Sequence, residues 1–136
     1  TMEVKLNPLD VIIDDSKIIE LSIIANMTPD ENESGTYDLQ ANYDARPIRS
    51  SKGDNFLDLS VEIASNGAPT YDIKIVTRTM FVFPKETRDE LIDAYLRTEG
   101  AVRALDFVRT YVRSATAAGV WGSFDLPGIP LQTTTK

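Results

Sequence analysis

The chain has 136 residues, 42% of them hydrophobic, and a formal net charge of -7, which fits one acidic globular domain with one core. Because binding to a phosphate backbone needs clustered Lys and Arg, an acidic chain of this kind is not expected to bind nucleic acid. It contains no cysteine and no histidine, which excludes disulfides, thiolate zinc sites, a thiol nucleophile and the usual general base at neutral pH.

Alternating apolar residues predict four strands between about residues 17 and 83. The segments are KIIELSIIANM (17–27), TYDLQANYDA (36–45), FLDLSVEIAS (56–65) and TYDIKIVTRTMFVF (70–83). Polar, turn-forming stretches separate them, including RPIRSSKGDN (46–55) and NGAP (66–69). Each strand has one apolar face, so the pattern favours an antiparallel meander with one covered side.

Pro84 ends the predicted sheet, and the apolar period then becomes that of a helix. Two helices are expected between about residues 85 and 119, the first capped at Gly100 and the second ending at Gly119. Their arginines should form a solvated face with acidic partners three or four residues away. The predicted fold is α+β, a four-stranded antiparallel sheet followed by two C-terminal helices packed on one face, in one domain spanning 1–136.

An apolar segment without helical or strand period follows the second predicted helix. It reads FDLPGIPL (124–131), and its two prolines oppose both a helix and a strand ladder. We interpret residues 121–131 as a structural strap that lies across the second helix and closes the end of the core.

Two acidic motifs invite a chemical role, and each has a simpler explanation. DENESG (30–35) resembles the start of a calcium loop, but the twelfth position is Ala41 where a Glu is needed, and an acidic hairpin turn explains it equally well. Asp14 and Asp15 could divide acid and base roles, yet they also fit a turn before the first strand. No glycine-rich phosphate loop, nucleophile elbow or metal-ligand spacing occurs in the sequence. We therefore expect no enzyme activity and no metal or other cofactor.

Large apolar residues concentrate near the strand-to-helix junction and in the tail. Most should lie in the core of so small a domain, and the others could line an apolar groove that works through shape and area. The candidate polypeptide-binding residues are Phe81, Phe83, Leu105, Val112, Trp121 and Phe124.

The order of elements and the tail resemble the bacterial export chaperone SecB and its relatives. The resemblance rests on TMFVF (79–83) at the end of the sheet, on the helical region that ends in the pattern R-x-x-V-x-x-x-T-x-x-G, and on LPGI (126–129). It runs from about Lys17 to Leu131. It implies a four-stranded antiparallel sheet, two helices and a closing segment.

The same resemblance implies a cytoplasmic holdase that binds unfolded or partly folded polypeptides without ATP, as a homo-oligomer, either a dimer or a tetramer. No apolar run is long enough to span a bilayer, so we expect no membrane insertion. SecB usually carries a Cys- and His-containing tail that binds zinc and contacts the translocase motor, and an N-terminal Asn-Ala-Pro signature; this chain has neither.

These departures fit a divergent SecB-like protein that serves a dedicated client, such as an antitoxin or an exported protein, and that a host, phage or mobile element encodes. Two other hypotheses stay open. One is a non-catalytic interaction or structural subunit that binds a folded partner. The other is a pocket protein for a small apolar ligand.

Overall fold

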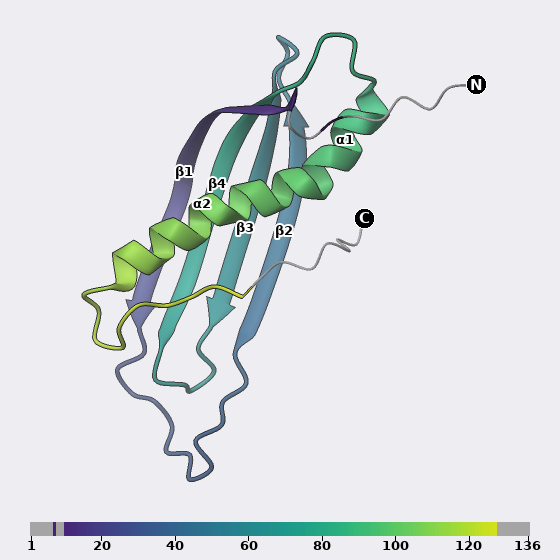
Figure 1. Cartoon of the computed structure of the whole chain (residues 1–136). Coiled ribbons are helices and arrows are strands. Elements are labelled where there is room, and N and C mark those ends of the chain that lie inside the picture. Colours follow the sequence, from purple (N-terminus) through teal and green to yellow (C-terminus); the bar gives the residue numbers. More distant parts are fainter. Residues whose placement is uncertain (1–6, 8–9, 128–136) are drawn as a thin grey trace.

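The computed structural model describes residue 7 and residues 10–127. The elements in chain order are β1 (Ile12–Ala25), β2 (Gln40–Arg49), β3 (Asn55–Ala64), β4 (Tyr71–Val82), α1 (Asp89–Arg97) and α2 (Glu99–Thr116). Figure 1 shows one twisted sheet with both helices on the same face, α2 crossing the strands obliquely. This two-layer α+β arrangement is the predicted one. Within residues 10–127, no helix is long and apolar enough to cross a membrane.

The strand order is β1-β4-β3-β2, and every pairing is antiparallel. The predicted meander is therefore wrong in one respect, because β1 pairs with β4 and lies at the edge opposite β2. The connection 26–39 passes around the end of the sheet to join the two edges (Figure 1). It is held to the β3–β4 turn by the side-chain amide of Asn26, which donates to the Ala68 carbonyl at 2.9 Å, and by the Asp30 N–H, which donates to the Gly67 carbonyl at 2.8 Å.

This topology changes the interpretation of the acidic motif at residues 30–35. The motif lies in a long connection between two strands that do not pair, so it is not a hairpin turn as predicted. Its turn is local, because the side-chain oxygen of Asn32 accepts hydrogen bonds from the backbone N–H and the hydroxyl of Ser34, at 3.0 and 2.6 Å.

β1 begins at Ile12, earlier than predicted, and it includes Asp14 and Asp15, which were expected in a turn. A β-bulge interrupts its pairing with β4 between Ile18 and Glu20. A bulge adds an unpaired residue and shifts the alternation of side chains. As a result Ile18 and Leu21 lie opposite Thr77 and Ile75 on the same, helix-covered face. A single period of two could not describe this strand.

β2 begins at Gln40 rather than Thr36, and it continues through Arg46–Arg49, where a turn was predicted. Pro47 is tolerated there because β2 is an edge strand, and an edge strand leaves one row of backbone groups without ladder partners. Pro47 lies opposite the fully buried Leu57 of β3.

The break between the helices falls at Thr98 (φ −117°, ψ −92°), not at Gly100. Its hydroxyl donates to the Ala94 carbonyl at 2.7 Å. Gly100 lies inside α2, where an added Cβ would be 3.2 Å from the Tyr95 carbonyl oxygen and 3.5 Å from the ring of Phe81. The predicted cap is therefore wrong, and this glycine instead permits close packing of the helix junction against the sheet.

The core lies between the sheet and the helices. The residues with no exposed area include Leu57, Leu59, Val61 and Ile75 from the two central strands and Val108 and Val112 from α2. Thr77 and Thr79 are also fully buried on this face of β4. The Thr79 hydroxyl lies 3.1 Å from that of Ser16 and shares a hydrogen bond with it, whereas the Thr77 hydroxyl has no partner among the described residues.

Candidate functional site

The structure divides the predicted binding residues into a buried set and an accessible set. The buried set is Phe81, Leu105 and Val112, each at most 2% exposed. A second molecule cannot reach these residues while the helices cover the sheet. The accessible set is Trp121, which is exposed, with Phe83 and Phe124, which are half-buried and pack against the core.

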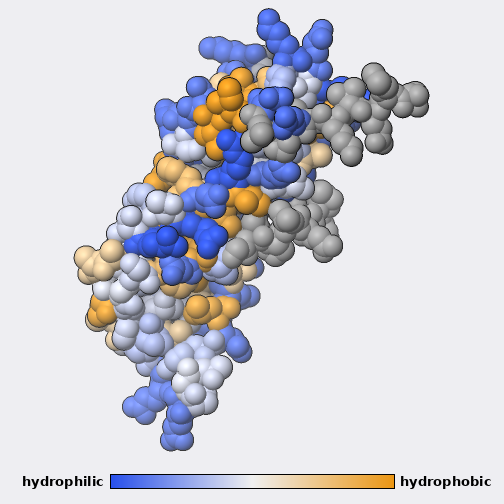
Figure 2. All heavy atoms as spheres, viewed as in Figure 1, coloured by the Kyte–Doolittle hydropathy of each residue, from blue (hydrophilic) through white to orange (hydrophobic). Residues whose placement is uncertain are grey.

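The accessible residues do not form one cluster. Phe83 follows β4, and its ring meets that of Tyr95 in α1 edge to face, with centroids 5.6 Å apart. Trp121 and Phe124 follow α2, whose C-terminal end lies at the other end of the helical layer (Figure 1). Figure 2 shows the helix-bearing side, on which apolar groups gather at several places between polar ones. The predicted groove residues are therefore separated, and their role in polypeptide binding stays a prediction.

Trp121 belongs to a small exposed apolar group at the end of the sheet. Its indole N–H donates to the Asn26 carbonyl at 3.1 Å, which places the ring beside the end of β1. Trp121 is 38% exposed, and the neighbouring Met27 and Val120 are 66% and 57% exposed. We call Met27, Val120 and Trp121 the end patch. Such a group suits contact with another apolar chain.

Residues 122–127, which we call the strap, run from the end of α2 across the helix-bearing face toward β2 (Figure 1). Leu126 is 2% exposed and belongs to the core. The Phe124 N–H donates to the Thr116 hydroxyl at 2.8 Å, and the Tyr43 hydroxyl donates to the Pro127 carbonyl at 2.6 Å. The strap thus lies beside α2 and places one leucine side chain in the core. The rest of the predicted strap, residues 128–131, lies outside the described residues.

Side chains rather than a backbone ladder hold the strap. Arg113 Nε donates to Asp125 Oδ1 at 2.7 Å, and the Tyr71 hydroxyl donates to the Gly122 carbonyl at 2.8 Å. From residue 123 to residue 127, the described structure contains no backbone-to-backbone hydrogen bond. Sequence reasoning missed these partners, because it expected the arginines of the helical region to pair three or four residues away within it.

Tyr43 is positioned by β2 at the far end of the strap. Burial raises the pKa of Tyr43 above its ordinary value of 10.0, and the positive charge of Arg109 offsets part of that rise. The hydroxyl therefore stays protonated, and able to donate to Pro127, throughout the neutral pH range.

Among the residues that the structure describes, no strand pairs with the outer edge of β1. This strand has 14 residues, and its exposed apolar side chains are Ile12, Ile19, Leu21 and Ile24, which are 43% to 63% accessible. A long edge with unpaired backbone groups and apolar side chains is a template for another strand. The opposite edge, β2, is less suitable because Pro47 interrupts its row of backbone donors.

The sheet face away from the helices carries charged side chains, and several of them form ion pairs. Arg78 lies 2.8 Å from Asp58, and Lys74 lies 3.4 Å from Glu20. The hydrogen bond from Arg78 to Asp58, with the attraction between their charges, raises the pKa of Arg78.

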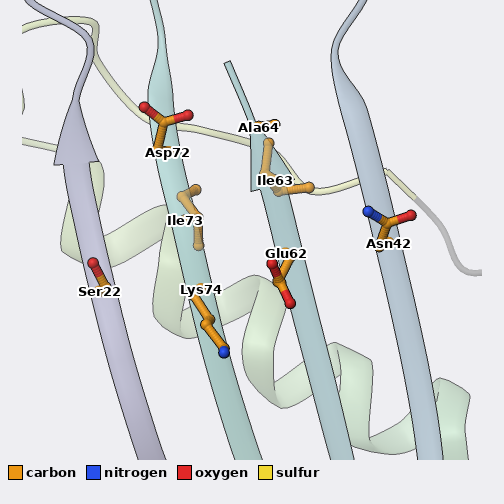
Figure 3. A pocket seen from close by; sticks show the side chains of 8 residues that line it. All are labelled: Ser22, Asn42, Glu62, Ile63, Ala64, Asp72, Ile73 and Lys74. Atoms are coloured by element: carbon orange, nitrogen blue, oxygen red, sulfur yellow. The ribbon is translucent and has the colours of Figure 1, made fainter. Parts of the chain in front are cut away.

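A depression of about 280 Å³ opens on this face, and Figure 3 shows side chains from four neighbouring strands around it. Its lining residues are Ser22, Asn42, Glu62, Ile63, Ala64, Asp72, Ile73 and Lys74. Among the residues that the structure describes, no group of three or more acidic or other ligand side chains is placed to hold a metal ion.

Comparison with known proteins identifies the fold. No protein-family model matches the sequence, and no curated protein matches it. Among solved structures, the chain is similar to the SecB-like chaperone Rv1957 of Mycobacterium tuberculosis, solved in complex with a ChAD peptide from the Rv1956 HigA1 antitoxin. That match has a TM-score of 0.68 at 12% identity and covers 89% of this chain and 92% of the other. A protein of unknown function from Streptococcus agalactiae matches with a TM-score of 0.53 at 15% identity, over 86% of this chain and 96% of the other.

The chain thus shares its α+β fold with these solved structures. Specifically, the fold is SecB-like, as the motifs in the sequence indicated, and at 12% identity the chain is a divergent example of it.

Proposed function

We propose that this protein is an ATP-independent holdase that binds non-native segments of a dedicated polypeptide client and performs no chemistry on them. The observation that carries the proposal is the SecB-like fold, shared over 89% of the chain with a chaperone solved in complex with an antitoxin peptide. An antitoxin or an exported protein is the kind of client we propose here. The protein works in the cytoplasm and needs no metal or other cofactor.

The client-binding role belongs to accessible apolar surface. An unfolded chain offers apolar side chains, and the end patch can accept them. Phe83, Trp121 and Phe124 are the predicted residues that touch the client. Phe81, Leu105 and Val112 support this surface from the core. The net charge of -7 favours clients rich in Lys and Arg through long-range attraction.

We further propose a homo-oligomer in which β1 edges of two copies pair, giving a dimer or, from two dimers, a tetramer. The depression in Figure 3 lies among charged side chains, so it does not favour the alternative of a pocket for a small apolar ligand. A subunit that binds one folded partner remains the competing proposal.

A binding titration with a defined unfolded protein tests the proposal. Reduced and carboxamidomethylated α-lactalbumin, labelled with a fluorophore, is titrated with the wild-type protein, with Trp121→Ala and with Phe107→Ala. Phe107 is a matched control, because it is 36% exposed on α2 and lies outside the end patch. We expect Trp121→Ala to weaken binding by about 1 to 2 kcal/mol, as truncation of an aromatic anchor does, and Phe107→Ala to leave it unchanged. Absence of binding by the wild-type protein would exclude a holdase and favour the folded-partner alternative.

A further inference from the structure

The strap is bound in the way that a peptide ligand is bound. One apolar side chain, Leu126, is inserted into the core, and polar side chains from β2 and α2 hold the backbone and one carboxylate around it. We propose that the strap occupies a docking site for an extended client segment and so inhibits client binding until it leaves. This inference rests on the proposed function, because it names the segment that the holdase prefers.

The contacts of the strap define that segment. Arg113 Nε donates to the carboxylate of Asp125, so the site favours an acidic residue at this position of a bound segment. The next residue, Leu126, fills an apolar space and is 2% exposed. The hydroxyl of Tyr43 donates to the carbonyl of Pro127, which any residue at that position can supply. The preferred client segment is therefore an acidic residue followed by a large apolar residue, in extended conformation.

The strap is held weakly enough to be displaced. The side chains of Arg113 and Asp125 are 56% and 68% exposed, and exposed ion pairs contribute little to stability. Residues 123–127 make no backbone-to-backbone hydrogen bond within the described chain; Leu126 is their one fully buried side chain, and Phe124 is half-buried against the core. A segment that occupies a site about 90% of the time weakens the apparent affinity of an external ligand about tenfold. A strap of this kind weakens client binding without preventing it.

A peptide experiment tests the docking site without any client. Fluorescein-labelled GSFDLP, the sequence of residues 122–127, is titrated by fluorescence anisotropy with the wild-type protein and with Leu126→Ser, whose strap has lost its anchor. We expect Leu126→Ser to bind the peptide at least tenfold more tightly than the wild type. The control peptide GSFDSP should not bind, and adding Arg113→Ala to Leu126→Ser should weaken binding of GSFDLP. Equal affinity for the wild type and a folded Leu126→Ser overturns the proposal.

A second measurement covers the case in which Leu126→Ser does not fold. The chain has no cysteine, so a nitroxide can be attached at Ser123→Cys in the strap, with Ser114→Cys on α2 as the control. Both positions are exposed. Saturating GSFDLP should mobilise the label at position 123 and not at position 114, and unfolded α-lactalbumin should do the same. A label at position 123 that stays immobile with both ligands overturns the proposal.

These results separate this inference from the proposed function. If the peptide binds Leu126→Ser but unfolded α-lactalbumin does not bind the wild type, the docking site is supported and the holdase function is excluded. If α-lactalbumin binds while the peptide titration and the spin label show no displacement of the strap, the holdase function is supported and inhibition by the strap is excluded. A fall in the mass of the wild-type protein on adding GSFDLP would show that straps are exchanged between two copies, and would overturn a client as the occupant.

Discussion

Thr77 places a hydroxyl in the part of the core where β4 faces the helices. It is fully buried and finds no hydrogen-bond partner in the described part of the chain. A buried hydroxyl without a partner loses its hydration and gains nothing in return, at a cost of about 1 to 3 kcal/mol.

We therefore expect Thr77→Val to raise the free energy of unfolding by about 1 kcal/mol, and the melting temperature by about 3 to 5 °C. Thr79→Val is the matched control. The Thr79 hydroxyl shares a hydrogen bond with the Ser16 hydroxyl, so its removal should not stabilise the fold. Thermal unfolding followed by circular dichroism measures both. A lower melting temperature for Thr77→Val would contradict the assignment of an unpaired hydroxyl.

Tyr43 makes stability depend on alkaline pH. Its pKa is higher in the folded protein than the ordinary value of 10.0, so the folded state holds the proton more tightly than the unfolded chain does. This contribution is complete below the unfolded pKa and is lost as the pH rises through the folded pKa. We expect the free energy of unfolding to fall above about pH 10, and to fall less steeply in Tyr43→Phe. Urea unfolding at a series of pH values would test this, and an identical slope in both proteins would count against it.

Gly119 lies where the chain turns back into the strap. A Cβ at this position would be 2.3 Å from the hydroxyl oxygen of Tyr71, which bonds Gly122 and Trp121. Because Tyr71 is buried and cannot move freely, Gly119→Ala should destabilise the fold by about 1 to 3 kcal/mol. The loss should be smaller when Tyr71→Phe is already present, since the clashing oxygen is gone. Additive losses in a double-mutant cycle of chemical unfolding would refute this explanation.

Among the strands and helices, the alternation of side chains within a regular strand could be predicted from the sequence. The pairing of one strand with another could not. The core faces of β3 and β4 follow from simple alternation, and the predicted turn between them is present, with positive φ at Asn66 (48°) and Gly67 (81°). The pairing of β1 with β4 depends on the path of residues 26–39, which alternation does not encode. The bulge in β1, Pro47 within β2 and the break at Thr98 are local exceptions that a regular period cannot predict.

The candidate site could likewise be predicted only in part from the sequence. Of the residues that the sequence named, Phe83, Trp121 and Phe124 lie at least partly at the surface, and their role in binding stays a prediction. Arg113 and Tyr43 were missed, since their bonds to Asp125 and Pro127 exist only after the strap has crossed the sheet. Phe81, Leu105 and Val112 were chosen on hydrophobicity alone, which does not separate core from surface.

For the whole molecule, the open edge at β1 predicts self-association. Ile24 is 63% exposed near the end of this strand, and a lysine on an edge strand opposes pairing with another strand. Ile24→Lys should shift the mass in size-exclusion chromatography with light scattering from a dimer or tetramer toward a monomer, with little change in melting temperature. Val82→Lys, at a 44% exposed position on the interior strand β4, should leave the mass unchanged. A wild-type protein that is already a monomer would contradict pairing through β1.

The proposed function requires that the protein holds unfolded polypeptide without ATP. The most direct measurement is light scattering of a chemically denatured protein, such as rhodanese, diluted into buffer with increasing amounts of the chain and no nucleotide. We expect the wild-type protein to suppress aggregation at near-stoichiometric amounts. More of the Trp121→Ala variant should be needed for the same suppression, and Phe107→Ala should behave like the wild type. Aggregation that proceeds unchanged at a several-fold excess of the wild-type protein would contradict the proposed function.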